Sequence, residues 1–183
     1  MKEAPKFGIT LALYSSVACT LLALVNLVTA PLIAEAKNAE TQAGLKIVFP
    51  GDQYVFEEVT GFANDPASSV KVERLFLAKA GGATDGVVVQ ATGPTYDRAT
   101  ILIGVDKNRK ISAIQFTALS DTPGFGKRAE EPAFRDQFKG KSIDDPFVSK
   151  SDVTAISGAS ITSNGVSRIL KYATGIAGEY LNK

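Results

Sequence analysis

Ser157-Gly158-Ala159-Ser160-Ile161-Thr162-Ser163 stands directly before a stretch in which apolar side chains recur at helical spacing. The recurring residues are Val166, Ile169, Leu170, Ala173, Ile176, Ala177, Tyr180 and Leu181. This spacing predicts a C-terminal amphipathic helix that follows the hydroxyl cluster. A helix N-terminus offers unpaired N–H groups and the positive end of the helix dipole, so the segment is a candidate anion site. An ordinary serine-rich helix cap is the alternative.

A second unusual segment is Ser120-Asp121-Thr122-Pro123-Gly124-Phe125-Gly126. Proline and two glycines predict a stiff turn whose backbone a ligand can approach closely. Small residues in the first segment, Gly158 and Ala159, leave similar room. An ordinary Pro-Gly turn is the alternative for this second segment.

Together the two segments resemble the signatures of FMN-binding domains, [S/T]-G-A-[S/T]-x-[S/T] and E-T-P-G-x-G, the second with Asp121 in place of Glu. The residues after the second segment, Glu131-Pro132 and 134–141, also follow the family's order. The chain resembles the G subunit of the Rnf electron-transport complex and the related C subunit of the sodium-translocating NADH:quinone reductase. Those proteins usually carry Asp at the position of Thr154.

The resemblance implies that FMN is joined through its phosphate to Thr162, which would make the chain a phosphoprotein with a covalent flavin. It also implies that a flavin transferase attaches the cofactor. The resemblance assigns the remaining cofactor-binding residues to the two segments: Ser157, Gly158, Ala159, Ser160 and Ser163 in the first, and Asp121, Thr122, Pro123, Gly124, Phe125 and Gly126 in the second.

The N-terminal part of the chain contains an apolar run, residues 8–34, without a charged side chain. About 20 apolar residues are enough to cross a bilayer as a helix. Lys2 and Lys6 outweigh Glu3 before the run, which predicts that residues 1–7 are cytoplasmic and residues 35–183 form an extracytoplasmic domain. The predicted location is the inner (cytoplasmic) membrane, and a cleaved signal peptide is the alternative.

The composition excludes several classes of function. The net charge is +1 and the basic residues do not cluster, so no nucleic-acid partner is expected. The chain has no His, and its one Cys, Cys19, lies in the apolar run. The soluble part therefore lacks the usual ligands of haem, iron–sulfur clusters and zinc, and no metal site is expected. A redox function would need an organic cofactor.

The middle of the chain is rich in Val and Ile and predicts successive strands. The predicted strands are residues 70–78, 84–92, 99–105 and 111–117, and a short helix is predicted at 132–138. Short turns between neighbours favour an antiparallel sheet. The predicted fold is α+β, a largely antiparallel sheet with packed helices on a single N-terminal transmembrane helix.

The resemblance implies an electron-carrying component rather than a complete enzyme, with no catalytic residues of its own. The expected partners are the other membrane subunits of an Rnf-type ion-translocating ferredoxin:NAD oxidoreductase. Two alternatives remain open at the level of the sequence. One is a stand-alone membrane-anchored flavin reductase, and the other is a non-redox extracytoplasmic domain.

Overall fold

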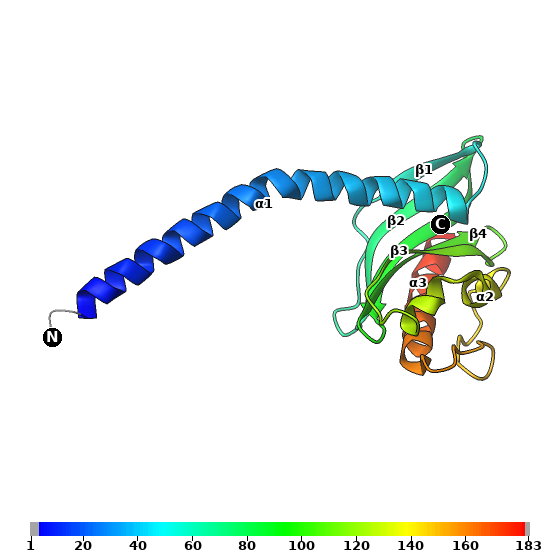
Figure 1. Cartoon of the computed structure of the whole chain (residues 1–183). Helices are drawn as coiled ribbons and strands as arrows, with labels where there is room; N and C mark the ends of the chain where they lie inside the picture. Colours follow the sequence, from blue (N-terminus) through cyan, green and yellow to red (C-terminus); the bar gives the residue numbers. More distant parts are fainter. Residues whose placement is uncertain (1–3, 182–183) are drawn as a thin grey trace. The chain divides into compact units, whose positions relative to one another are not determined.

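Five consecutive strands form one antiparallel sheet, in which each strand pairs with its neighbours along the chain (Figure 1). The computed structural model describes residues 4–181. The strands are β1 (Tyr54–Val59), β2 (Lys71–Ala80), β3 (Ala83–Pro94), β4 (Arg98–Asp106) and β5 (Ile111–Leu119). The helices are α1 (Ala4–Val48), η1 (Gly126–Glu130), α2 (Pro132–Arg135), η2 (Asp136–Phe138) and α3 (Ser160–Leu181). This arrangement confirms the predicted α+β fold.

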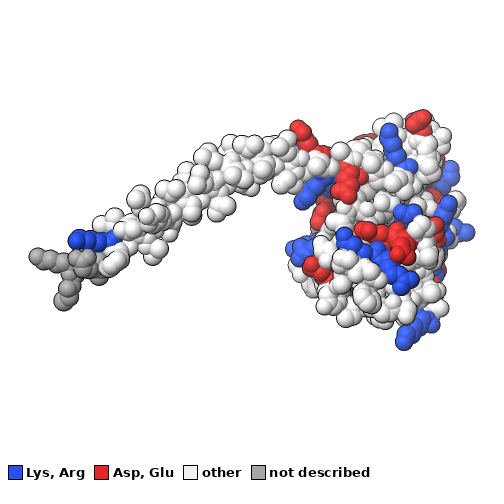
Figure 2. All heavy atoms as spheres, viewed as in Figure 1, with Lys and Arg blue, Asp and Glu red and all other residues white. Residues whose placement is uncertain are grey.

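Helix α1 contains the apolar run predicted to cross the membrane. Within residues 4–181 it is the one helix long and apolar enough to span a bilayer. Figure 2 shows no charged atoms along most of its length beyond the N-terminal end. The hydroxyls of Thr10, Thr20 and Thr29 donate to the carbonyl four residues earlier, so these polar groups are satisfied within the helix.

The chain divides into two compact units, of which the first ends at Glu40 and the second begins at Thr41. The last turns of α1 therefore belong to the globular unit, where Thr41, Leu45 and Val48 are buried. The carbonyl of Val48, near the end of the helix, accepts a hydrogen bond of 2.7 Å from the Ser112 hydroxyl. A side chain of the sheet thus satisfies one of the carbonyls left free at the helix end.

One face of the sheet packs against the end of α1. The buried cluster there consists of Leu45, Val48, Phe49, Phe76, Ala78, Val88 and Leu102. The ring of Phe49 lies over two glycines, since a Cβ at Gly86 would be 2.3 Å from the ring and one at Gly104 would be 3.1 Å from it. These glycines make room for an aromatic ring directly on the sheet.

The other face of the sheet packs against α3 and the segment between β5 and α3. All eight residues of the predicted apolar periodicity lie in this core or pack against it. Phe134 and Phe138, from α2 and η2, fill the core beside them with an edge-on contact of 5.4 Å between ring centroids. The C-terminal helix and the short helical segment at 132–138 are therefore confirmed.

The start of α3 differs from the expectation. The helix begins at Ser160, inside the hydroxyl cluster rather than after it. Ser163 explains this start, because its hydroxyl donates to the carbonyl of Ala159 at 3.0 Å and accepts from the N–H of Ile156 at 2.9 Å. The side chain joins the first turn to the residues before it, so the helix starts within the signature.

Candidate functional site

The two segments singled out in the sequence meet at a hydrogen bond between Thr162 and Asp121. The hydroxyl Oγ1 of Thr162 donates to Oδ2 of Asp121 at 2.5 Å, although the residues are 41 positions apart in the chain. Each of the two residues is 1% exposed. The first turn of α3 and the loop after β5 therefore form one site, as expected from their sequences.

Asp121 is held by three further donors, all from the turn between β3 and β4. Oδ1 accepts from the Thr95 hydroxyl at 2.6 Å and from the N–H of Asp97 at 2.9 Å, and Oδ2 accepts from the N–H of Tyr96 at 3.3 Å. Burial raises the pKa of the Asp121 carboxyl, but the hydrogen bonds, that of Thr162 foremost, outweigh this and leave the pKa below its ordinary value. The carboxylate is therefore ionised at neutral pH.

Two glycines allow this close assembly. A Cβ at Gly126 would lie 2.6 Å from Cβ of Asp121 and 2.7 Å from Oγ1 of Thr162. A Cβ at Gly165 in α3 would lie 2.6 Å from the backbone of Thr95. These three distances are too short for a side chain, so the backbone of Gly126 lies against the Asp121 and Thr162 side chains and that of Gly165 lies against the β3–β4 turn.

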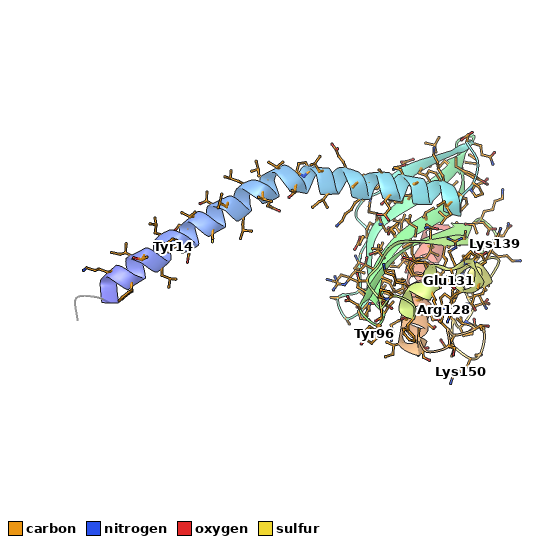
Figure 3. All side chains as sticks on the ribbon, in the orientation of Figure 1. Tyr14, Tyr96, Arg128, Glu131, Lys139 and Lys150 are labelled. Carbon is orange, nitrogen blue, oxygen red and sulfur yellow. The ribbon has the colours of Figure 1, made fainter. Side chains whose placement is uncertain are left out.

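A cavity of about 440 Å³ opens beside the Asp121–Thr162 pair. Its lining residues come from three segments of the chain: Tyr96, Thr122, Phe125, Gly126, Gly158, Ala159, Ser160, Ile161 and Thr162. Three large apolar side chains on the lining remain more than half exposed, namely Phe125 at 57%, Ile161 at 60% and Tyr96 at 66%. Figure 3 labels Tyr96 at the rim of the domain. The cavity thus combines a buried polar pair with an apolar rim.

Most of the predicted site residues reach this cavity, but not all. Asp121 lies behind Thr162 rather than on the lining. Ser163 is fully buried and bonds only the backbone of the preceding segment. Pro123 and Gly124 are exposed beside the cavity, and Ser157 lies on a neighbouring cavity of about 530 Å³.

The turns in both segments depend on glycine. Gly124 and Gly158 have φ angles of 77° and 80°, a region that other residues rarely adopt. A Cβ at Gly158 would also lie 3.3 Å from the Phe125 ring, so this glycine lets the two segments approach each other.

Sequence reasoning missed the turn between β3 and β4. Thr95 and the N–H groups of Tyr96 and Asp97 hold the carboxylate, and the Tyr96 side chain lines the cavity. The available signal was a short polar turn, Thr95-Tyr96-Asp97, between two apolar strands. Such turns are common, and nothing local indicates that this one faces a loop about 25 residues further along.

Thr154, at the position where the family usually carries Asp, is held by backbone hydrogen bonds to the Gln137 side chain. The backbone N–H of Thr154 donates to Gln137 Oε1 at 2.8 Å, and Gln137 Nε2 donates to the Thr154 carbonyl at 3.2 Å. Asp152, two residues earlier, accepts from the N–H of Val148 at 2.6 Å. The segment before the signature is thus fixed without a carboxylate at residue 154.

Comparison with known proteins agrees with this geometry. The FMN-binding domain family matches residues 96–175, and the RnfG N-terminal region family matches residues 1–48. In Acetobacterium woodii, the G subunit of the Na(+)-translocating ferredoxin:NAD(+) oxidoreductase complex is 31% identical over 185 residues, covering 88% of this chain and 85% of that protein. In Escherichia coli K12, the G subunit of the ion-translocating oxidoreductase complex is 30% identical, covering 94% and 90%.

A solved structure shows the same fold at lower identity. The crystal structure of Shewanella oneidensis NqrC aligns with a TM-score of 0.50 and 24% identity, over 60% of this chain and 59% of that one. The alignment therefore spans less than two thirds of either chain.

Proposed function

We propose that this chain, which belongs to the RnfG family of ion-translocating oxidoreductase components, carries electrons at the membrane through FMN bound covalently to Thr162. The chain contains an FMN-binding domain and, within residues 4–181, one candidate membrane-spanning helix. Covalent attachment, the side of the membrane and the partners within the complex are the proposed parts. FMN supplies the ability to accept and release one or two electrons.

The residues around the cavity fit a flavin phosphate. The first turn of α3 surrounds the cavity with Ser160, Ile161 and Thr162, so the free N–H groups and positive dipole end of a 22-residue helix favour an anion there. The volume of about 440 Å³ is within the range of small-ligand clefts. A side chain on Gly126 would close the approach to Thr162.

The apolar rim fits a flat aromatic ring that stays accessible. Phe125 and Tyr96 offer aromatic surfaces from two loops, and aromatic rings pack well against other planar systems. Both side chains are more than half exposed, so a ring held between them would remain in reach of a redox partner. The rim therefore suits electron exchange better than an enclosed reaction on a small substrate.

The observation that carries the proposal is the place of the Thr162 hydroxyl. It is the one hydroxyl of the signature that both lines the cavity and bonds the opposite loop. Ser160 also lines the cavity but is exposed, and Ser163 is turned into the backbone behind it. Thr162 is thus the attachment point that both the geometry and the family signature favour.

Intact-mass measurement of the chain purified from membranes tests the attachment. The wild-type protein should carry the added mass of FMN and fluoresce on a denaturing gel. Thr162→Ala should lose both signals, whereas the matched variant Ser160→Ala should keep them, because it removes a neighbouring hydroxyl of the same cavity. Covalent flavin on Thr162→Ala would refute the assignment.

The proposed topology places residues 35–183 outside the cytoplasm, where a flavin transferase acts on Thr162. A covalent bond would prevent loss of the cofactor into a dilute exterior. Protease added to intact cells without an outer layer should digest the domain and leave an N-terminal stub in the membrane. Digestion only in inverted vesicles would reverse the topology.

The proposed partners are the other membrane subunits of an Rnf-type complex. Mild detergent extraction followed by affinity purification should yield the chain together with several membrane proteins. Isolation of the chain alone, with flavin reduction by an added electron donor, would favour a stand-alone flavin reductase instead.

A further inference from the structure

Formation of a phosphoester at Thr162 requires that its hydroxyl lose a proton. An unassisted aliphatic hydroxyl is a weak nucleophile and is normally activated by an adjacent base. In this chain the Thr162 hydroxyl already donates to a carboxylate at 2.5 Å, within the reach needed for proton transfer. We infer that Asp121 accepts the proton of Thr162 during flavin attachment, so the acceptor domain supplies a catalytic residue for its own modification. This inference rests on the proposed attachment of FMN to Thr162.

The surroundings leave Asp121 as the base nearest the reacting atom. The chain contains no His. Within residues 4–181, the polar side chains that line the cavity besides Thr162 are those of Tyr96, Thr122 and Ser160, all of them hydroxyls. Asp121 is the only carboxylate hydrogen-bonded to Thr162 in this part of the chain.

The Asp121 carboxylate is held in place by four hydrogen-bond donors. Three donors from the β3–β4 turn hold Asp121 in addition to Thr162, and Gly126 keeps the loop backbone against the pair. A base held in this way needs no rearrangement before the reaction, and preorganisation of this kind lowers the barrier.

The ionisation state of Asp121 agrees with a role as proton acceptor. The hydrogen bonds on Asp121 keep its pKa below the ordinary value despite burial, so the carboxylate is charged and able to accept a proton at neutral pH. A carboxylate of this kind is a weak base. The proton therefore moves as the new bond forms rather than before it, as with aspartates that accept substrate hydroxyl protons in other phosphoryl transfers.

The transfer of FMN to Thr162 is a balanced reaction when a flavin dinucleotide donates the FMN group. Oγ1 of Thr162 forms a bond to the phosphorus of the FMN moiety, and its proton passes to Oδ2 of Asp121. The pyrophosphate bond breaks, and the nucleoside monophosphate leaves with the bonding electron pair. Asp121 then releases the proton to water, retaining the donors from Thr95, Tyr96 and Asp97. No electrons are gained or lost overall.

The test measures the rate of flavin attachment to the full chain in detergent, with a purified flavin transferase, flavin adenine dinucleotide and Mg²⁺. In-gel flavin fluorescence and intact mass follow the product. Asp121→Asn should slow attachment by about 100-fold or more, the usual effect of losing a general base. Asp121→Glu should restore the rate to within about 10-fold of wild type, because it restores a carboxylate of the kind the family carries at this position.

Asp97→Asn is the matched control, because it makes the same change at an exposed side chain of the adjoining turn and leaves the Asp121 carboxylate, its hydrogen bond from the backbone N–H of residue 97 and the Thr162 hydroxyl in place. Its rate should stay within about threefold of wild type, a small effect beside loss of the base. Thermal midpoints of all variants should be recorded alongside the rates. Attachment to Asp121→Asn at the wild-type rate would overturn the inference, and so would equal slowing in Asp97→Asn or no recovery in a folded Asp121→Glu. A wild-type chain that stays unmodified while a known acceptor domain is modified would instead refute covalent attachment itself.

Discussion

The two faces of the sheet both contain glycines at close contacts, but only one face has the Asp121–Thr162 cavity. Beside the end of α1, Gly86 and Gly104 leave space for the ring of Phe49, and the surrounding cluster is entirely apolar. Beside α3, Gly165 and Gly126 bring backbone against Thr95 and Thr162, which are polar. Close packing at glycines therefore produces an apolar core on one face of the sheet. On the other face it produces a buried hydrogen-bonded pair, Asp121 and Thr162, beside a cavity.

Removal of the Phe49 ring should have the largest effect on folding and almost none on the site. Phe49→Ala should lower the free energy of unfolding by about 3–5 kcal/mol, because a buried aromatic ring leaves a cavity. Urea denaturation of the full chain in detergent measures this. Ile47→Ala is the control, because Ile47 is 49% exposed and should change stability by less than about 0.5 kcal/mol. A large drop in flavin attachment to folded Phe49→Ala would contradict the separation of the two faces.

Unlike removal of the Phe49 ring, addition of a methyl group at Gly126 should disturb the functional site directly. Gly126→Ala places a Cβ between Asp121 and Thr162, so it should cost about 1–3 kcal/mol from overpacking and also impair flavin attachment. Gly175→Ala in α3 is the matched control, since nothing lies within 4 Å of its added Cβ and alanine favours a helix by about 1 kcal/mol. Normal flavin attachment in Gly126→Ala would show that the pair tolerates separation.

Thr95→Val should have a smaller effect on stability. The substitution keeps the shape of the side chain but removes one of four hydrogen bonds to a buried carboxylate, which should cost about 1–3 kcal/mol, nearer the lower end because three donors remain. Thermal unfolding of Thr95→Val and wild type provides the measurement. Unchanged stability would mean that the remaining donors fully replace the lost one.

The smallest expected effect is that of acidification, which should destabilise the two faces of the sheet at different pH values, both of them low. The folded-state pKa of Asp121 is lowered, so its contribution to stability is complete above the unfolded pKa of about 3.9 and is lost as the pH falls through the folded value. The protection factors of backbone amides, which are corrected for the intrinsic exchange rate at each pH, should therefore fall first around Asp121 and Thr162 as the pH drops below about 3.9. The Phe49 cluster contains no titratable group among its buried residues and should respond later. Simultaneous exchange at both faces would contradict this order.

Much of the fold was accessible from sequence because its signals are local. The periodicity of 166–181, the Val- and Ile-rich strands and the uncharged run of 8–34 each depend on residues close in the chain. The burial of Leu45 and Val48 at the end of α1 was not evident, because it depends on packing on the sheet rather than on residues close in the chain.

The site was predictable as two motifs, but its internal geometry was not. The sequence places Asp121 and Thr162 in separate signatures, whereas their hydrogen bond depends on how α3 crosses the sheet. The family signature singles out Thr162, but it does not show that the start of α3 at Ser160 turns the Ser163 hydroxyl to the backbone and the Thr162 hydroxyl to the cavity. Such differences follow from a one-residue step of about 100° around a helix.

The order of strands along the chain has a consequence for biosynthesis. A sheet made only of neighbouring hairpins can form from local pairings as the polypeptide emerges, which favours rapid folding. The proposed acceptor hydroxyl, that of Thr162, lies in α3, the last element. It meets Asp121, which also accepts from Thr95, only when three distant segments have come together. We expect a flavin transferase to find a properly presented threonine only on finished molecules. Flavin fluorescence would then count the correctly matured fraction of the protein, and truncated or misfolded chains would remain colourless.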